Sequence, residues 1–557
     1  MIPSLAPLLL ALPTLQSPAE PEAGARLVVL ISVDQLMPEQ LDRMAGHLDG
    51  GIGRLLREGR RFPAALPYAV TETGPGHATF ATGCLPSSHG VVANSFYDRI
   101  SGKHLYCVEG PEAKAVTTMG VQEVGGNGRS PVNLRRPSLG AHLRKGTPDT
   151  KIVSISAKDR AAITMAGEAA DAVLWWDRTG LGFVSSDHYC TELPAWAKDW
   201  NEGWLERTAG WIWEPTFSAD DVPPGTAPDV RPGEGRIGSS GPAFPYVFGK
   251  TPAEEYSAEE RVALAKMAYV SPLVDRFVIE QARRAVETEG LGADGVVDLL
   301  CVSFSACDTV GHTFGPFSHE TTDLILRLDE GLGELFADLD QKVGEGRWVA
   351  ALTADHGVLP LVETLAEQGL PAARLTIEQR RELQRHVEKA VAAAFELDDD
   401  RAVRFPARST GFFFDAEQLA AQGLSPAEVR AVVAKAALEV DWVHRAYPRE
   451  HLLSTKPTDD EFLVLARASN VEDRGMDVQI VGQPYLLMGG ASGTSHGSPH
   501  PYDRRVPLLF YGPGFEPGTV EVAQPVGPEC AVPTLLDAIG REPGGPLDGR
   551  SLLGSAR

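Results

Sequence analysis

Two short stretches of the sequence place carboxylates and imidazoles at spacings that suit a metal ion. Asp308 and His312 lie four residues apart in CDTVGH, so one helical turn would bring both side chains to the same cation. Asp355 and His356 are adjacent in TADHG, and Gly357 permits the sharp turn that would let both reach one ion. The D-x-x-x-H pair alone is more often a helix cap with a solvated histidine. Its interpretation therefore depends on what the rest of the chain supplies.

Further candidate ligands follow other apolar stretches. Asp34 ends the run ARLVVLISVD, where a buried carboxylate would be costly without a nearby cation. His496, in GTSHGS, is flanked by small residues that would let it approach a metal, and His500 is a spare in the same loop. A set rich in histidine suits two zinc-like ions about 4 Å apart, which serve in-line displacement at phosphorus, better than calcium or magnesium. The candidate ligands are Asp34, Asp308, His312, Asp355, His356 and His496.

The stretch TETGPGHATFATG, residues 71–83, contains a possible nucleophile. A threonine at a helix start is usually an N-cap, and that is the simpler interpretation of Thr73. Beside two metal ions, however, the Thr73 hydroxyl could lose its proton and attack as an alkoxide, with its oxygen as a further metal ligand. Free N–H groups at the helix start would then favour phosphoryl oxygens.

These residues need elements that bring them together. Four apolar runs, at 25–34, 151–160, 298–308 and 348–357, each end in charged or polar residues. Runs that are apolar on both faces are typical of buried parallel strands, and helical patterns at 263–289 and 320–342 lie between them. We expect an α/β fold with a doubly wound, mostly parallel sheet and helices on both faces. Ligands of such sheets bind beyond the carboxyl ends of the strands.

The chain divides into a core and two insertions. We expect the core at 25–359 and 481–557, with a Trp/Pro/Gly-rich insertion at about 190–260. Residues 360–480, with amphipathic patterns at 376–396 and 417–438, are expected to form an inserted α+β subdomain. Five tryptophans of the first insertion could line a lid, but we expect them to pack the loop onto the core. They are Trp196, Trp200, Trp204, Trp211 and Trp213.

Composition limits the classes of partner. The 557 residues are 43% hydrophobic and carry a formal net charge of -24, which disfavours nucleic-acid binding but leaves room for a small anion in a local cationic pocket. Residues 1–20 resemble a secretory signal peptide, although no Lys or Arg precedes the apolar run, so we expect a periplasmic or secreted protein. No membrane span is expected, and we expect a monomer. The six cysteines contain no C-x-x-C pair, and one or two disulfides are compatible with export.

Seven motifs occur in one order: VDQL, TETGPGH, PSSHGVVAN, SAKDRAAI, CDTVGHTFGP, TADHG and GTSHGS. This set resembles the alkaline phosphatase superfamily, in particular its nucleotide pyrophosphatase/phosphodiesterase-like branch and the bacterial phosphate-irrepressible alkaline phosphatases. The resemblance runs from about residue 25 to 540. It implies two zinc ions per chain, the second of which stabilises the leaving oxygen and later activates water. The implied ligands are Asp34, Thr73, Asp355 and His356 for one ion and Asp308, His312 and His496 for the other.

The same resemblance implies catalytic roles. Thr73 would be the nucleophile and become phosphothreonine, Asn94 would contact a phosphoryl oxygen, and Lys158 and Arg160 would bind the phosphoryl group. His77 and His89 would be structural residues of their motifs. Since the Lys/Arg pair resembles the monoesterase branch, the expected function is an alkaline phosphatase of broad specificity that releases inorganic phosphate. The alternatives are a phosphodiesterase or nucleotide pyrophosphatase with the same metals and threonine, and, from another class, an inactive phosphate- or metal-binding protein.

Overall fold

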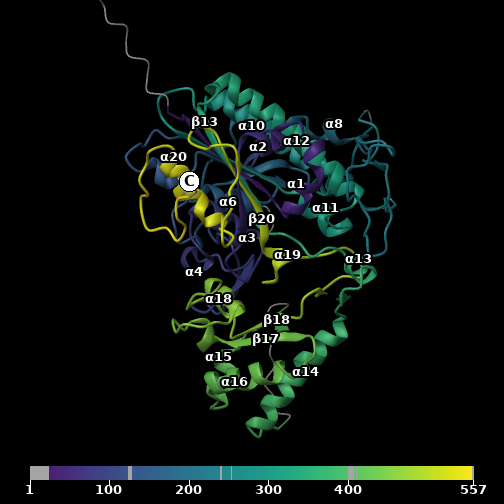
Figure 1. Cartoon of the computed structure of the whole chain (residues 1–557), viewed down its shortest axis with the longest axis vertical. Helices are drawn as coiled ribbons and strands as arrows, with labels where there is room; N and C mark the ends of the chain where they lie inside the picture. Colours follow the sequence, from purple (N-terminus) through teal and green to yellow (C-terminus); the bar gives the residue numbers. More distant parts are fainter. Residues whose placement is uncertain are drawn as a thin grey trace, which may run out of the picture.

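The computed structural model describes residues 24–122, 128–238, 241–252, 254–398, 407–408 and 411–554. The expected signal peptide at residues 1–20 lies outside these ranges. Figure 1 shows a broad body with a large sheet, and a narrower part below it that contains β17, β18, α14, α15 and α16. Among the described residues, no helix combines the length and the apolar character needed to cross a bilayer.

The central strands of the large sheet are parallel, as predicted. The sheet has eleven strands in the order β21-β2-β20-β13-β1-β12-β7-β8-β9-β5-β6. Each neighbouring pair from β13 to β8 runs parallel, and Leu27 of β1 is level with Asp298 of β12 and Trp348 of β13. The parallel strands are β13 (Trp348–Thr353), β1 (Leu27–Val33), β12 (Asp298–Phe304), β7 (Ile152–Ser156) and β8 (Ala172–Asp177).

Antiparallel strands extend this centre on both sides. On one side β20 (Arg505–Tyr511) pairs antiparallel with both β13 and β2 (Arg60–Ala65), and β21 (Gly518–Thr519) completes that edge. On the other side β9 (Gly182–Ser186) runs antiparallel to β8. The strands β5 (Ala115–Thr117) and β6 (Gly120–Gln122) follow β9. The chain thus reverses at the margins while the centre stays parallel.

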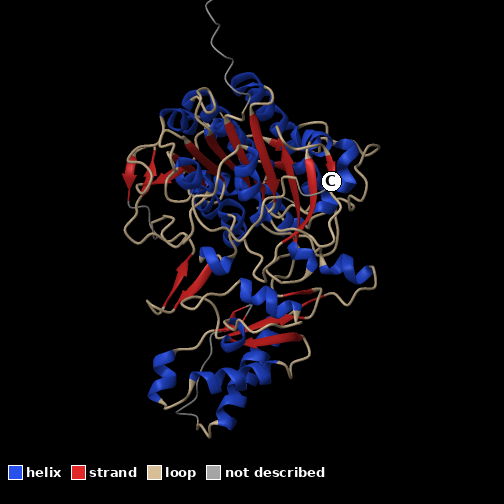
Figure 2. Ribbon diagram, turned by 60° about the vertical axis from the view of Figure 1, so that its left-hand side comes forward, coloured by secondary structure: helices blue, strands red, loops and turns tan. Residues whose placement is uncertain are grey.

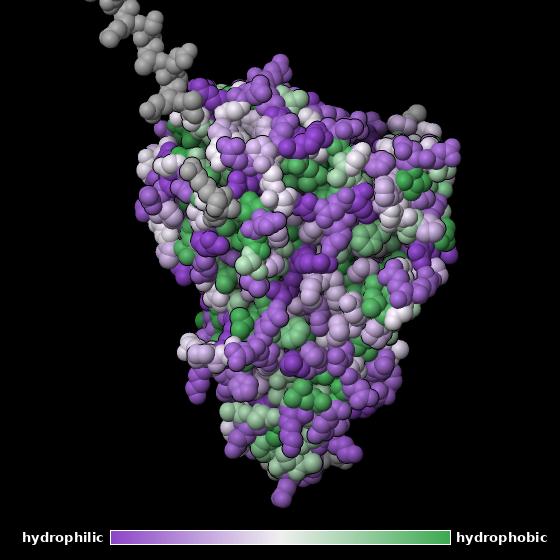
Figure 3. Space-filling view, viewed as in Figure 1, coloured by the Kyte–Doolittle hydropathy of each residue, from purple (hydrophilic) through white to green (hydrophobic). Residues whose placement is uncertain are grey.

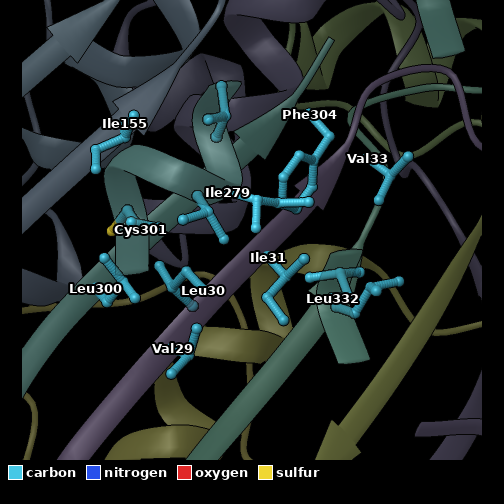
Figure 4. Close-up of a cluster of buried hydrophobic side chains, with 14 of the residues drawn as sticks. Val29, Leu30, Ile31, Val33, Ile155, Ile279, Leu300, Cys301, Phe304 and Leu332 are labelled. Carbon is cyan, nitrogen blue, oxygen red and sulfur yellow. The ribbon is translucent and has the colours of Figure 1, made fainter. Parts of the chain in front are cut away.

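Helices lie on both sides of this sheet (Figure 2), because both of its faces are apolar. One group contains α2 (Gly51–Glu58) and α10 (Pro272–Glu289), which both pack on α12 (His319–Leu339). Another contains α3 (Thr73–Thr82), α6 (Asp159–Ala166) and α20 (Ala531–Ala538). Figure 4 shows the core that results, with side chains of β1, β7 and β12 against α10 and α12.

Two expected helices are each broken into two. The pattern at 263–289 is α9 (Ala258–Tyr269) followed by α10, because Ser271 caps a new helix that begins at Pro272. The pattern at 417–438 is α15 (Ala416–Ala421) followed by α16 (Pro426–Ala437). Gly423 adopts a positive φ of 70° between α15 and α16 and ends the first of them. Apolar periodicity continued through both breaks and concealed them.

The tryptophans of the first insertion pack into the main core, as expected. Trp200 and Trp213 are fully buried, and Trp196 and Trp204 are nearly so. Trp176 of β8 meets Trp200 and Trp204 edge to face. All six cysteines are free thiols, so the structure forms none of the disulfides that export would have allowed.

A second, smaller sheet has its own core. Its order is β15-β16-β18-β17, with β17 (Val443–Pro448) antiparallel to β18 (Val478–Gly482). The short strands are β15 (Ala407–Arg408) and β16 (Gly411–Phe412). The helix α14 (Ile377–Ala394) packs on α16, and both contribute to a hydrophobic cluster separate from the main core. This unit lies in the chain between β13 and β20. The face of the molecule in Figure 3 is mostly hydrophilic, in keeping with the acidic composition.

Candidate active site

The predicted metal ligands meet at the carboxyl ends of the parallel strands. Asp34 follows β1, Asp308 lies in the first turn of α11 (Ala306–Phe314) after β12, and Asp355 and His356 follow β13. Since β13, β1 and β12 are adjacent in the sheet, three distant parts of the chain deliver side chains to one place. The loop before α19 (Pro501–Arg504) adds His496.

One group of ligand atoms comes from Asp308, His312 and His496, which lie within 4.8 Å of one another. His312 Nε2 is 3.1 Å and His496 Nε2 is 3.6 Å from Asp308 Oδ1. His312 Nδ1 lies 2.7 Å from the carbonyl oxygen of Thr494, and His496 Nδ1 lies 2.7 Å from that of Thr71. Because a carbonyl only accepts, Nδ1 carries the hydrogen in both rings and Nε2 keeps its lone pair for a cation.

The second group consists of Asp34, Asp355 and His356. His356 Nε2 lies 3.4 Å from both Asp34 Oδ1 and Asp355 Oδ2. In the described part of the chain these three atoms are buried and accept or donate no hydrogen bond. Such orphaned polar atoms are costly in a protein interior. The donor set therefore fits a bound cation.

Electrostatics support the same conclusion. Burial raises the pKa of Asp34, and the negative charges of Asp308 and Asp355 raise it further. Burial also lowers the pKa of His356 and of His496, which keeps both imidazoles neutral, the form that binds a metal. In His312 burial acts to lower the pKa, but the charge of Asp308 prevails and raises it. The cluster thus combines crowded carboxylates with two neutral imidazoles, and positive charge would relieve the repulsion.

Lys158 lies between the two groups. Its Nζ is 2.5 Å from Asp34 Oδ2 and also donates to Asp308 Oδ2. Burial opposes its protonation, but the attraction of Asp308 and Asp34 prevails and raises the pKa of Lys158. A buried ammonium therefore remains charged at this site.

Thr73 is the first residue of α3, and Glu72 occupies the N-cap position without a side-chain cap bond. The interpretation of Thr73 as an ordinary N-cap is therefore wrong. Its Oγ1 accepts a hydrogen bond of 3.1 Å from Arg160 Nη2. A Cβ on Gly76 would lie 2.3 Å from the Asp355 carbonyl oxygen, so glycine is what lets α3 approach the strand end.

Asn94 is oriented by its neighbours. Its Oδ1 accepts the Gly74 N–H at 2.7 Å, which leaves its NH₂ group to donate to another partner. The backbone N–H of Asn94 donates to Glu72 Oε2 at 2.6 Å. Burial raises the pKa of Glu72, against the lowering effects of the Asn94 N–H and the Arg160 charge. Glu72 was missed from the sequence, although it lies in the TETGPGH motif.

Arg160 is held by residues that the sequence did not single out. Its Nη1 is 3.4 Å from the Tyr106 hydroxyl, which donates to Asp159 Oδ1 at 2.6 Å. Arg129 Nε donates to Asp159 Oδ2 at 2.6 Å. Asp159 is a neighbour of Arg160 in SAKDR, whereas nothing in the sequence connects Tyr106 or Arg129 to this motif.

Gln35, in VDQL, was also missed. Its backbone N–H donates to Asp355 Oδ1 at 3.1 Å and its side chain to Asp308 Oδ1 at 2.8 Å. The residue has a φ of 71°, a left-handed conformation that is uncommon outside glycine and often found at functional sites. Gln35 thereby links both groups of ligands.

The remaining motif histidines have other partners. His77 Nδ1 pairs with the Thr73 carbonyl at 2.9 Å and Nε2 with Ser303 Oγ at 2.8 Å. His77 Nδ1 also lies 3.3 Å from Asp355 Oδ2, but both of its ring nitrogens already have hydrogen-bond partners. His89 pairs with Thr79 Oγ1, and His500 Nε2 pairs with the Gly482 carbonyl at 2.9 Å. These contacts favour structural roles for all three.

Comparison with known proteins identifies relatives of the whole chain. A model of the family described as type I phosphodiesterase / nucleotide pyrophosphatase matches residues 28–442. Alkaline phosphatase PhoV of Synechococcus elongatus is 31% identical over 89% of this chain and 87% of its own length. Alkaline phosphatase PafA of Elizabethkingia meningoseptica is 30% identical over 92% of this chain and 90% of its own. The crystal structure of wild-type alkaline phosphatase PafA matches with a TM-score of 0.84 at 27% identity, covering 96% of this chain and 99% of that one.

Proposed function

The chain belongs to the type I phosphodiesterase/nucleotide pyrophosphatase family, and from this premise we propose that it is an alkaline phosphatase that hydrolyses phosphate monoesters and releases inorganic phosphate. The observation that carries the proposal is the Arg160 guanidinium on Thr73 Oγ1, with the Lys158 ammonium beside the metal ligands. A monoester dianion has one more charged oxygen than a diester. The half-buried Arg160 at the nucleophile and the buried Lys158 beside the metal ligands favour that extra charge.

The proposal includes two zinc ions per chain. Asp34, Asp355 and His356, with the oxygen of Thr73, would hold one, and Asp308, His312 and His496 would hold the other. The mixture of carboxylate and imidazole donors supports zinc over calcium or magnesium. When bound, the ions would stabilise negative charge on the attacking and leaving oxygens.

The residues of the chain have distinct tasks in the proposed reaction. Thr73 Oγ1 forms a bond to phosphorus as the ester oxygen departs, which gives a phosphothreonine that water then cleaves to phosphate. Arg160 and the NH₂ group of Asn94 donate to phosphoryl oxygens that do not take part in bond exchange. Glu72 positions Asn94, and Asp159 with Tyr106 positions Arg160.

Relative turnover of p-nitrophenyl phosphate and bis-p-nitrophenyl phosphate tests the proposed function. We expect the zinc-loaded protein to prefer the monoester strongly at alkaline pH. A preference for the diester would retain the metals and Thr73 but assign the chain to the phosphodiesterases. Absence of turnover on either ester, with zinc bound, would indicate an inactive binding protein.

Replacing both Lys158 and Arg160 by alanine should harm monoester hydrolysis far more than diester hydrolysis. We expect kcat/KM for the monoester to fall by about 10³-fold and that for the diester by less than about tenfold, because only the monoester loses partners for its extra charge. The matched control is R381A/K389A on α14, which removes the same charges from an exposed surface. Equal losses on both esters would mean that the pair is only structural.

Asn94 variants separate donation to substrate from support of the helix. Asn94→Asp keeps an acceptor for the Gly74 N–H but replaces the NH₂ donor by a negative charge. We expect it to lower kcat/KM more than Asn94→Ala does, and the alanine variant to lose about 10- to 100-fold. Steady-state kinetics with unchanged zinc content would check this. An aspartate variant as active as wild type would show that the amide donates nothing to the substrate.

Export and a monomeric state belong to the proposal as well. Export rests on the signal-like sequence of residues 1–20 and predicts that the mature protein, recovered from the periplasm or medium, lacks this segment. N-terminal sequencing of the recovered protein tests this prediction. Retention of residues 1–20 would contradict export. Sedimentation velocity tests the monomer.

A further inference from the structure

A cavity of about 1120 Å³ adjoins the candidate active site on the side of β7 and β8. Its wall includes Lys158 and Arg160, which follow β7, and Trp175 near the end of β8. Tyr269, at the end of α9, closes another side. Because β7 lies next to β12 in the sheet, the cavity continues the same edge that holds the metal ligands.

Arg160 joins the cavity to the nucleophile. The same guanidinium that donates to Thr73 Oγ1 lies 3.4 Å from the hydroxyl of Tyr106, which lines the cavity. A phosphoryl group bound at Thr73 would therefore meet Arg160 at the boundary between the two spaces. The organic part of the substrate has room to extend from there into the cavity.

The wall of the cavity carries further cations, among them Arg178 and Lys266, whose side chains are exposed. The Arg178 guanidinium lies 4.9 Å from the centre of the Tyr269 ring. Burial raises the pKa of Tyr269, whereas the charges of Lys158, Arg160 and Arg178 act to lower it, so all three cations lie within electrostatic range of one phenol. Within the described residues, neither Arg178 nor Lys266 forms an ion pair with a carboxylate.

The wall has fewer carboxylates than cations: Glu112, Asp159 and Asp177 against Lys114, Arg129, Lys158, Arg160, Arg178 and Lys266. Asp159 is paired with Arg129, and Asp177 Oδ1 accepts the N–H groups of Thr179 and Leu181. Glu112, the third, is exposed at the rim. A locally cationic cavity in a protein of net charge -24 needs an explanation beyond general surface charge.

We propose that this cavity is a second anion subsite, in which Arg178 and Lys266 bind a second phosphate on the leaving group of the substrate. The inference rests on the proposed monoesterase function and makes it narrower. The favoured substrates are bisphosphorylated compounds, whose scissile phosphate lies at Thr73 and whose other phosphate lies beyond Tyr269. The aromatic side chains of Trp175 and Tyr269 border the linker.

The test compares butane-1,4-diol monophosphate with the corresponding bisphosphate, with p-nitrophenyl phosphate as a third substrate. The bisphosphate has two equivalent phosphates, so its kcat/KM is twice that of the monophosphate on statistical grounds alone. A contribution from the subsite must raise this ratio above two. We expect the wild-type kcat/KM to favour the bisphosphate by about tenfold or more, from charge-assisted contacts. R178E/K266E should abolish this preference and leave p-nitrophenyl phosphate turnover within about twofold.

A matched control is R381E/K435E, which makes the same change of charge on exposed positions of α14 and α16. We expect it to keep the bisphosphate preference. The inference is overturned if wild type shows no preference for the bisphosphate or if R178E/K266E retains that preference. It is also overturned if R178E/K266E and R381E/K435E lose the preference equally, because the net charge of the protein would then explain the loss. R178Q/K266Q, with no added negative charge, should lose the preference as well. Failure of wild type on p-nitrophenyl phosphate would instead refute the proposed function.

Discussion

Thr73→Ala should lower kcat for p-nitrophenyl phosphate by about 10⁴-fold or more, because it removes the hydroxyl that attacks phosphorus in the proposed reaction. Arg160 donates to Thr73 Oγ1, and α3 presents this residue at its first turn. Zinc content should remain near two per chain, since the two proposed sites have six other side chains as ligands. Inductively coupled plasma mass spectrometry and steady-state kinetics on one preparation would check both.

Thr73→Ser is the matched control for the nucleophile. It retains a hydroxyl and should keep most of the turnover, and acid-quenched protein should carry phosphate on residue 73. An alanine variant with substantial turnover would assign the nucleophile elsewhere. If the alanine variant lost its zinc, the Thr73→Ser control would have to show whether residue 73 attacks phosphorus or only binds the metal.

Removal of the metal should abolish turnover and also lower the melting temperature. Asp34, Asp308 and Asp355 crowd one buried site, so loss of the cations leaves their repulsion compensated mainly by Lys158. We expect turnover to fall by about 10³-fold or more with a chelator. We expect Tm to fall by several degrees, because bound metal stabilises the folded state. Paired activity and thermal-denaturation measurements would report both effects.

Readdition of single metals provides the control. Zinc should restore turnover and Tm together, whereas magnesium and calcium should restore neither fully, because the donor set contains three imidazoles. Full activity of the metal-free protein would contradict the two-metal proposal. Full recovery with calcium alone would contradict the choice of zinc.

The sequence predicted the centre of the fold better than its margins. The run at 25–34 is strand Leu27–Val33, because a strand apolar on both faces has a distinctive pattern. β20 is also apolar through its centre, yet it runs antiparallel, and strand direction leaves no trace in composition. The helix breaks at Ser271 and Gly423 were missed because the apolar pattern continues across both of them and outweighs the local capping signals.

The candidate site shows a similar division. Short motifs were enough to single out Asp34, Asp308 and Asp355, because each follows an apolar run directly. Gln35 and Tyr106 act through contacts with segments far away in the chain, such as the bond from Gln35 to Asp308. Such contacts depend on how strands are ordered in the sheet, which a single sequence does not specify.

The position of β20 also affects how the protein is made. β13 pairs with β1 on one side and with β20 on the other, and the whole of the second sheet lies between them in the chain. During synthesis, β13 must therefore wait with an unpaired edge until β20 has left the ribosome. An apolar strand with a free edge is an aggregation hazard, and pairing across so long a segment is slow. His496 lies shortly before β20 in the chain, so the nascent chain can complete the Asp308–His312–His496 group only at this same late stage.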